Sequence, residues 1–370
     1  MNTAIFFERN IISAESLRSV LDVFPRCTCS HLPTPLEKME NLSKKLGVNL
    51  YIKRDDQTGL ALGGNKARKL DFIMADALVQ GCDSIITWAG LQSNWCRQTV
   101  AAARKVGIKP ILILFNRPGL PAETDGNLFI DLLFDSEVKI VEMESGKNIM
   151  ELGEVSSFIE EAAEEERRKG NKPYVAPIGG SMTEGSMTKP LGAISFVNAF
   201  LEMRRQAGER NINPDYVVLA TGSGSTQAGL TVGAQLVTPQ TKVVGISVSD
   251  EKTTMGICIE TIVGQTFQEL GAARAKASEK VTILDDYIAE GYGILNQETA
   301  RAIRLVAETE GILLDPVYTG RAMVGLLDLI EKGYFEKDDN IVFWHTGGTP
   351  ALFPYREKIL DYLGKSGAAG

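Results

Sequence analysis

The sequence lacks an excess of positive charge. Its 370 residues include 39 Lys and Arg against 47 Asp and Glu, which gives a formal net charge of −8. Proteins that bind nucleic acid need a concentrated basic face, so this balance argues against a nucleic-acid partner. The densest basic stretch, "EEERRKG", mixes both signs of charge and predicts a solvated helix end.

Cysteine is scarce and has no framework spacing. The five cysteines are an odd number, and only Cys27 and Cys29 lie close together in the sequence. This usage predicts reduced thiols in an intracellular protein rather than a disulfide scaffold. His31 follows that pair, but no second ligand pair stands at zinc spacing, so we expect no metal site.

Long hydrophobic runs are also missing. No apolar stretch reaches the roughly 20 residues that a membrane-spanning helix needs. The first residues, "MNTAIFFERN", do not have the charged and then apolar layout of a signal peptide. We therefore expect no membrane partner and a cytoplasmic location.

Helix and strand patterns alternate through most of the chain, and the length suits two domains. Repeated strand–helix–strand units predict an α/β fold with parallel sheets covered by helices. The expected strands are 48–56, 84–90, 110–115, 138–143, 173–180, 215–224, 241–249 and 340–348. The expected helices are 34–47, capped by Thr34, and 65–81, 93–107, 124–134, 148–169, 189–207 and 225–237.

Two glycine-rich segments resemble phosphate-binding loops. The first, "GLALGGNK", fails the nucleotide-triphosphate pattern, because Lys66 follows Asn65 and Ala67 replaces the hydroxyl that would bind magnesium. The second, "VVLATGSGSTQAGL", runs from a strand into a helix, where backbone N–H groups and the helix dipole favour an anion. The residues of this second loop are Gly222, Ser223, Gly224, Ser225 and Thr226.

The second loop leaves three interpretations open. It is an ordinary tight turn, a phosphate cradle, or part of a dinucleotide site in which Asp250 ends the next strand. The dinucleotide pattern is weakened because Gln227 stands where the third glycine belongs.

Lys66 and Lys69 fall in the first turn of a predicted helix that Asn65 caps. Two cations at the positive end of a helix repel each other, so the arrangement is unfavourable unless something anionic or covalent compensates. Pyridoxal phosphate meets both needs, with Lys66 bound to its aldehyde and Lys69 near its phosphate. The alternative is that both lysines extend to water.

A set of motifs decides between these readings. In order, they are "RDDQTGLALGGNKARKL", "LQSNWCRQT", "ATGSGSTQAGL", "GYGILN", "LDPVYTGRAM" and "WHTGGTPALFPY". Together they resemble the D-cysteine desulfhydrase and 1-aminocyclopropane-1-carboxylate (ACC) deaminase family, from about Leu32 to Tyr355. The resemblance implies the tryptophan-synthase-β fold (fold type II) of pyridoxal phosphate enzymes, with two parallel-sheet domains.

The resemblance also assigns roles to residues that match the family. It implies that Lys66 forms the Schiff base with pyridoxal 5'-phosphate and moves the Cα proton, and that Lys69 and the Gly222–Thr226 loop hold the phosphate. Asn94 is similar to the residue that bonds the phenolic oxygen, and Ser93 to the one near the substrate carboxylate. Tyr292 and Tyr318 match two active-site tyrosines of the family, and Thr346 is similar to the residue that faces the pyridine nitrogen in the desulfhydrase branch.

Three features bear on the substrate. Thr319 replaces the glutamate of ACC deaminases, and with Thr346 it favours the desulfhydrase branch, because a hydroxyl partner makes the ring a weaker electron sink. Trp95 replaces the usual His or Gln and either narrows the substrate pocket or packs at the domain interface. The segment 179–193 looks longer than in relatives, and its Ser, Thr and Lys side chains either receive an anionic substituent or are solvated.

We therefore predict a lyase that eliminates the β-substituent of a small amino acid, with D-cysteine as lead substrate and pyruvate and ammonia as products. L-cysteate sulfo-lyase, 2,3-diaminopropionate ammonia-lyase and ACC deaminase remain alternatives. A nicotinamide-dependent oxidoreductase and a non-catalytic cofactor-binding protein represent other classes. We expect a homodimer in which residues 67–187 form a small domain inserted into a large domain of residues 1–66 and 188–370.

Overall fold

The structure is a computed structural model that describes residues 12–144, 155–274 and 281–365. Its strands are β1 (Leu36–Lys38), β2 (Asn49–Arg54), β3 (Ser84–Gly90), β4 (Lys109–Asn116), β5 (Glu137–Glu142), β6 (Pro173–Val175), β7 (Tyr216–Thr221), β8 (Lys242–Ser247), β9 (Thr282–Leu284) and β10 (Asn340–His345). They form a six-stranded sheet in the order β1-β2-β10-β7-β8-β9 and a four-stranded sheet in the order β5-β4-β3-β6.

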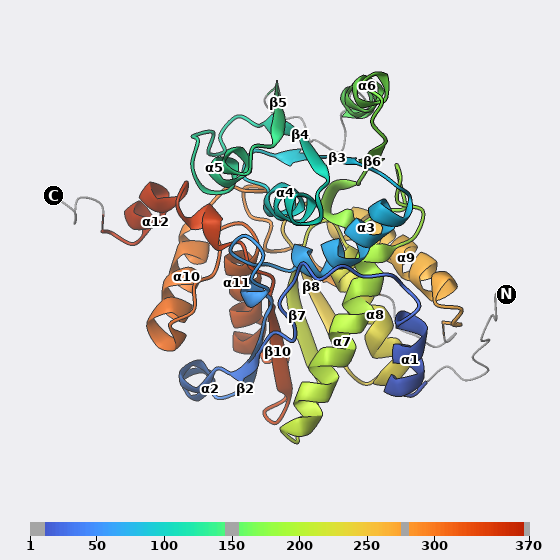
Figure 1. Cartoon of the computed structure of the whole chain (residues 1–370). Coiled ribbons are helices and arrows are strands. Elements are labelled where there is room, and N and C mark those ends of the chain that lie inside the picture. The colour runs from blue at the N-terminus through green and yellow to red at the C-terminus, as the bar shows by residue number, and fades with distance from the viewer. Residues whose placement is uncertain (1–11, 145–154, 275–280, 366–370) are drawn as a thin grey trace.

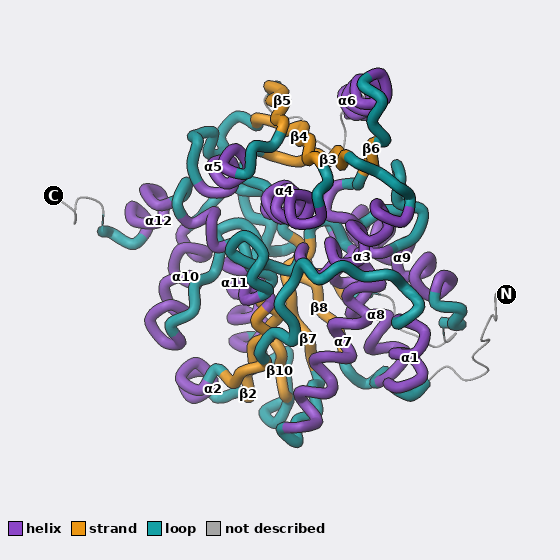
Figure 2. The backbone as a smooth tube through the Cα atoms, in the orientation of Figure 1, coloured by secondary structure: helices purple, strands orange, loops and turns teal. Residues whose placement is uncertain are grey.

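Within the described residues every strand pairing is parallel except that of β1 with β2. The α/β fold with two parallel-sheet regions is therefore confirmed. Figure 1 shows the larger sheet in the lower half of the molecule and the smaller sheet at the top, and Figure 2 shows the same strands in orange.

Helices cover both sheets. The α-helices are α1 (Ala14–Leu21), α2 (Glu40–Leu46), α3 (Lys66–Val79), α4 (Asn94–Val106), α5 (Gly126–Leu133), α6 (Val155–Arg168), α7 (Leu191–Glu209), α8 (Ser225–Val237), α9 (Lys252–Glu269), α10 (Gln297–Glu310), α11 (Thr319–Glu331) and α12 (Arg356–Tyr362). Short 3-10 turns are η1 (Asp55–Gln57), η3 (Ile178–Gly180) and η4 (Thr349–Leu352). No helix of the described part combines the length and apolar character that a membrane crossing requires.

The larger sheet is buried on both faces, as its strand composition predicts. On one face, Phe196 of α7 and Leu230 of α8 belong to the same core as Val217 and Trp344. The other face packs on α2, α10 and α11. In the smaller sheet, α3 and α4 share a core with one face and α6 with the other.

The two sheets divide the chain as the predicted domains do. All strands of the four-stranded sheet lie within residues 67–187, and all strands of the six-stranded sheet lie outside them. Helix α3 shares a core with residues of both α4 and α7. The domain limits at 66/67 and 187/188 stay a prediction.

The helix predicted over 34–47 is wrong in its first half. Residues Leu36–Lys38 form the edge strand β1, which pairs with β2, and the helix begins only at Glu40. Thr34 is not a cap, because its hydroxyl donates to Asp55 Oδ1 at 2.9 Å inside a buried polar network. Tertiary pairing overrides the local helical pattern here.

The order of strands brings their carboxyl ends together. The segments that follow β3, β4, β7, β8 and β10 all contribute residues to one cavity. In open α/β sheets this edge is where ligands bind.

Candidate active site

A cavity of about 370 Å³ lies where the strands of both sheets end. Most residues predicted from sequence line it, namely Lys66, Ser93, Asn94, Trp95, Gly222, Ser223, Gly224, Thr226, Tyr292, Tyr318 and Thr346. These residues are separated by up to 280 positions (Lys66 to Thr346) in the chain. The fold therefore assembles one site from segments that the sequence analysis had to treat one by one.

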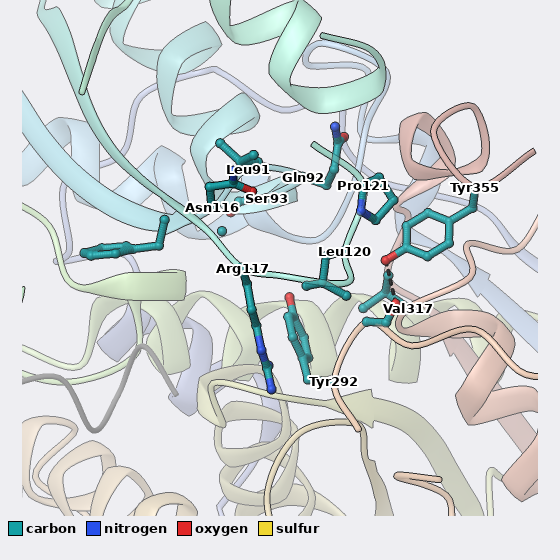
Figure 3. Close-up of a pocket in the computed structure, with 13 residues that line it drawn as sticks. Leu91, Gln92, Ser93, Asn116, Arg117, Leu120, Pro121, Tyr292, Val317 and Tyr355 are labelled. Atoms are coloured by element: carbon teal, nitrogen blue, oxygen red, sulfur yellow. Dashed lines mark hydrogen bonds between the residues drawn. The ribbon is translucent and has the colours of Figure 1, made fainter. Parts of the chain in front are cut away.

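A smaller cavity of about 40 Å³ adjoins the larger one (Figure 3). The two cavities share Gly90, Ser93, Arg117, Leu120 and Tyr292. None of the Gly222–Thr226 loop residues lines the smaller cavity. The site thus has two parts. The Gly222–Thr226 loop lines only the larger cavity, whereas Ser93 and Tyr292 line both cavities.

Two glycines shape the turn that leads to Lys66. Gly63 and Gly64 have φ angles of 70° and 130°, in the region that favours glycine. A Cβ atom on Gly63 would lie 1.8 Å from the Asp56 carbonyl oxygen, and one on Gly64 would lie 2.5 Å from Gln98 Nε2. Larger residues are excluded from this turn, which sets the start of α3 against the cavity.

Lys66 is the first residue of α3, and its amine sits in a poorly solvated place. Burial lowers the pKa of Lys66 to about 8. About a tenth of the amine is then uncharged at pH 7, far more than for an ordinary lysine, and the uncharged amine is the form that attacks an aldehyde. Asn65 stands at the N-cap position, but its side chain does not cap the helix as predicted, because its amide donates to Thr226 Oγ1 at 3.0 Å.

The loop after β7 leads directly into α8. Gly224, with φ of 89°, is the N-cap residue, and no side chain caps the first N–H groups of the helix. These groups and the helix dipole favour a phosphate. From the other side of the loop, the Ser181 hydroxyl donates to Ser223 Oγ at 2.8 Å.

Lys69, and Ser225 alone among the loop residues, do not line the cavity wall. The Lys69 amine donates to the Gly179 carbonyl at 2.9 Å and to Ser225 Oγ at 2.8 Å. Burial, followed by the charge of Lys66, lowers the pKa of Lys69 well below its usual range. Lys69 therefore supports the loop, and its direct contact with a phosphate stays a prediction.

Ser93 and Asn94 start α4 at the opposite side of the cavity. The Ser93 hydroxyl accepts from the Cys96 N–H at 3.2 Å, which is an ordinary helix cap. The side-chain oxygen of Asn94, Oδ1, accepts from Arg97 Nη2 at 3.4 Å and from Asn127 Nδ2 at 3.2 Å. Because that oxygen is held by two donors, the Asn94 amide nitrogen remains to donate to a ligand.

Trp95 both lines the cavity and packs in the protein core, the two positions that the sequence left open. It lines the cavity, and it is also buried in the core that joins the sheets, with only 3% of its surface exposed. Its indole nitrogen donates to Thr87 Oγ1 at 2.7 Å, so no donor remains for a ligand. Cys96 beside it is buried, and burial raises the pKa of its thiol well above the usual value. That environment fits a structural cysteine.

Tyr292 and Tyr318 meet at the cavity through their hydroxyl groups, whose oxygens are 2.6 Å apart. Burial raises the pKa of both phenols. Both groups therefore stay protonated at neutral pH and are able to donate a proton.

Thr346 and Thr319 are placed differently. Thr346 follows β10 and lines the cavity. The Thr319 hydroxyl donates to Asp315 Oδ1 at 2.6 Å, and Thr319 is not part of the cavity lining. Of the two threonines, only Thr346 presents a side chain to the site.

The segment 179–193 contributes less than the sequence suggested. Of its proposed anion-binding side chains, Ser181 lines the cavity. Ser186 accepts from the Val175 N–H at 2.9 Å, and Lys189 pairs with Glu269 at 2.8 Å. Thr183 accepts from Gln265 at 2.9 Å. These other side chains do not reach the cavity wall.

The sequence analysis missed Arg117 and Asn127. Arg117 follows β4 and lines both cavities, while Asn127 orients Asn94. The position of Arg117 two residues after the predicted strand 110–115 was the available signal, because ligands gather at the carboxyl ends of parallel strands. Asn127 carried no such signal, since only the fold brings it to Asn94.

Comparison with known proteins decides the family. A model of the family described as pyridoxal-phosphate dependent enzyme matches residues 29–347. The chain belongs to this family. A D-cysteine desulfhydrase of Yersinia enterocolitica is 42% identical over 347 residues, which are 93% of this chain and 100% of that protein. The resemblance seen in the motifs is confirmed, and the chain is a pyridoxal phosphate-dependent enzyme.

Solved structures give the same result for the fold. An ACC deaminase homologue is 36% identical, with a TM-score of 0.84 and coverage of 94% of this chain and 98% of that one. A threonine deaminase of Solanum lycopersicum is 16% identical, with a TM-score of 0.65 and coverage of 97% and 92%. The second protein shares the fold alone.

The residues of the cavity fit pyridoxal phosphate. The Lys66 amine suits the aldehyde, and the start of α8 suits the phosphate. The phosphate side has no room for larger residues, because a Cβ on Gly179 would lie 2.2 Å from Ser223 Oγ. The Asn94 amide nitrogen supplies a donor on the opposite wall.

Proposed function

We propose that this protein eliminates the β-substituent of a small amino acid, with D-cysteine as its lead substrate. D-cysteine and water would give pyruvate, ammonia and hydrogen sulfide. The observation that carries the proposal is the pairing, in one cavity, of a weakly basic Lys66 amine with the hydrogen-bonded phenols Tyr292 and Tyr318. An amine that takes a proton and a phenol that gives one are what an elimination requires.

The roles follow from where the groups lie. The Gly222–Thr226 loop would hold the cofactor phosphate, and Asn94 and Thr346 would bond its ring. The N–H groups at the start of α4, next to Ser93, would hold the substrate carboxylate by the same helix-terminus effect. When bound, pyridoxal phosphate supplies an electron-withdrawing ring that stabilises negative charge at the substrate Cα.

Proton movement would use Lys66 and the tyrosine pair. Lys66 Nζ takes the Cα proton, and the Cβ–S bond breaks with its electron pair on sulfur. A double bond forms between Cα and Cβ, and Tyr292 or Tyr318 gives a proton to the departing sulfur. Both phenols carry a proton at neutral pH, and their hydroxyl groups meet at the cavity with oxygens 2.6 Å apart, which places that proton where this role needs it.

The alternatives are weaker. A neutral hydroxyl at Thr346 would not keep the pyridine nitrogen protonated, which suits a good leaving group better than the opening of a cyclopropane ring. The nicotinamide-dependent reading has no support in the family match. L-cysteate sulfo-lyase remains the nearest alternative, because it is also a β-elimination and differs in the leaving group and in the configuration at Cα.

We also propose a cytoplasmic homodimer. All five cysteines are free thiols, as expected in a reducing compartment. The dimer rests on the resemblance to the family, and light scattering would measure it: a mass near twice 40.2 kDa supports the dimer, and a mass near 40.2 kDa contradicts it.

Pyruvate release from D- and L-cysteine tests the proposed activity, with Lys66→Ala as the inactive control. We expect turnover with D-cysteine by the cofactor-loaded protein and none with the variant. If the cofactor-loaded protein binds D-cysteine but releases no pyruvate from any β-substituted alanine, the proposed activity is wrong and the protein is a non-catalytic cofactor-binding protein.

A further inference from the structure

Arg117 has a position that the proposed mechanism does not use. It is the first residue after β4, it is half-buried, and it lines both the large and the small cavity. Figure 3 shows its side chain reaching from the end of the strand into the space where Tyr292 also lies. In this view the guanidinium end of the side chain lies beside the ring of Tyr292.

The Arg117 guanidinium has no protein acceptor among the described residues. No hydrogen bond or ion pair links it to a carboxylate or a carbonyl group, and none joins it to Asp250, the only carboxylate of the described cavity lining. By contrast, Arg97 and Arg321, which are also close to the site, are held by backbone carbonyl groups. An unpaired guanidinium in a half-buried wall favours an anionic ligand.

The two anions already expected in the site have other partners. The cofactor phosphate has the start of α8, on the loop side. The α-carboxylate has the start of α4 beside Ser93. What remains of a small β-substituted amino acid is the group on Cβ, and the small cavity beside Arg117 is lined by Leu120 and Tyr292, with room for a few atoms.

We propose that Arg117 determines substrate specificity by binding a negatively charged substituent on the β-carbon, and this inference rests on the proposed function. The substrate class is β-substituted alanines whose substituent is an anion or leaves as one, such as a thiolate or a sulfonate. As the Cβ–S bond breaks with its electron pair on sulfur, the negative charge develops toward the guanidinium. A β-ammonium group, as in 2,3-diaminopropionate, would be repelled.

Binding of amino acids with and without an anionic β-substituent tests the proposal. The probes are alanine, aspartate and cysteate in both enantiomers, titrated into pyridoxal phosphate-loaded enzyme and followed by the visible spectrum. Arg117→Gln removes the charge, and Arg117→Lys keeps it. Lys139→Gln is the matched control, because it removes a cation of the same sheet that pairs with Glu161 outside the cavity.

We expect Arg117→Gln to weaken the binding of aspartate and of cysteate about 10–100-fold, because a charge-assisted hydrogen bond is lost. The affinity for alanine should not change. Arg117→Lys should restore part of this difference, and Lys139→Gln should change nothing. An equal loss for alanine and aspartate, or no loss for either, overturns the proposal. The proposed function is judged separately, by pyruvate release from D-cysteine.

Turnover by wild type and Arg117→Gln then separates the two sources of the anion. If D-cysteine turns over and depends on Arg117, the bound anion is the sulfur that leaves. If cysteate is preferred and depends on Arg117, the bound anion is a fixed sulfonate. Turnover of both at rates independent of Arg117 contradicts the inference.

Discussion

At the scale of single residues, the site depends on ionisable groups that are buried with few partners. Burial lowers the pKa of Lys66 to about 8, and it raises the pKa of Tyr292 and Tyr318. A base that is partly free and two acids that stay protonated then coexist at neutral pH. One physical cause, removal from water, acts in opposite directions on a cation and on neutral acids.

The pKa of Lys66 predicts how the cofactor-free protein reacts with pyridoxal phosphate. The uncharged amine is the reactive form, so the rate should rise with pH and level off above about 8, rather than continuing to rise toward the ordinary lysine value of 10.5. The rate of appearance of the visible absorption band, recorded over pH, measures this. A midpoint near 10.5 would mean that Lys66 is solvated.

Asn127 predicts a second effect, on the orientation of Asn94. Asn127→Ala removes the shorter of the two hydrogen bonds that hold the Asn94 side-chain oxygen and leaves only the longer one from Arg97, so the Asn94 amide is held less firmly. We expect several-fold weaker retention of pyridoxal phosphate and a shift in the pH at which the visible band changes. Asn171→Ala, whose amide donates to Glu166 away from the cavity, is the control. Equal behaviour of both variants would contradict a positioning role.

At the scale of elements, three helices begin at the cavity. The N-termini of α3, α4 and α8 carry Lys66, Ser93 with Asn94, and the Gly222–Thr226 loop. Each helix lies after a strand of one of the two sheets, so the strand ends fix where its first N–H groups lie. The connections between strands and helices therefore place N–H groups that favour anions around the cavity.

Gly224→Ala tests the loop at the start of α8. With φ of 89° and a Cβ that would lie 3.0 Å from Ile259 Cγ1, alanine is strained here. We expect a loss of ~1–3 kcal/mol in the free energy of unfolding and weaker binding of pyridoxal phosphate. Gly208→Ala in α7, where a Cβ would meet nothing within 4 Å, should instead stabilise by up to ~1 kcal/mol. Urea unfolding measures the free energy of unfolding of both variants. An equal change in the two would contradict the strain that we assign to alanine at position 224.

The sequence predicted these elements unevenly. The helix 225–237 matches α8 (Ser225–Val237), because a glycine loop and an apolar period mark it clearly. The strand β1 was missed, because Leu36–Lys38 is short and acquires its structure by pairing with β2. Helices α9, α10 and α11 were not predicted, and part of the helix expected at 148–169 lies outside the described residues.

The sequence predicted the site residues that lie in motifs and missed Arg117 and Asn127, which lie in none. Lys66, Tyr292 and the phosphate loop belong to recognisable motifs. Asn127 supports Asn94 across 33 positions, and the contact exists only once α4 and α5 pack together. A motif search has no access to such a contact.

At the scale of the whole molecule, a buried ionic network joins distant parts of the chain. Arg68 of α3 bonds Asp55 at 2.8 and 2.9 Å and Glu202 of α7 at 2.8 and 3.1 Å. Lys53 of β2 donates to the same Glu202 carboxylate. Although burial alone raises it, the pKa of Glu202 is held at about 2 by Arg68 and Lys53. The helix that presents Lys66 is thus fastened to the larger sheet.

Arg68→Ala should cost ~3–5 kcal/mol of unfolding free energy, because it leaves buried carboxylates without their partner. Arg205→Ala, which breaks an exposed pair with Glu209, should cost less than ~1 kcal/mol. Because the Glu202 pKa is lower in the folded protein than the ordinary 4.5, this contribution is complete above pH 4.5 and is lost as pH falls toward 2. Similar losses for both variants in urea at neutral pH would refute the network's role.

Borohydride reduction of the pyridoxal phosphate-loaded protein, followed by peptide mapping, tests whether Lys66 holds the cofactor. We predict that the visible band disappears and that a single pyridoxyl group is found on Lys66. Modification of Lys69 instead, or a protein that stays colourless with added pyridoxal phosphate, would contradict it.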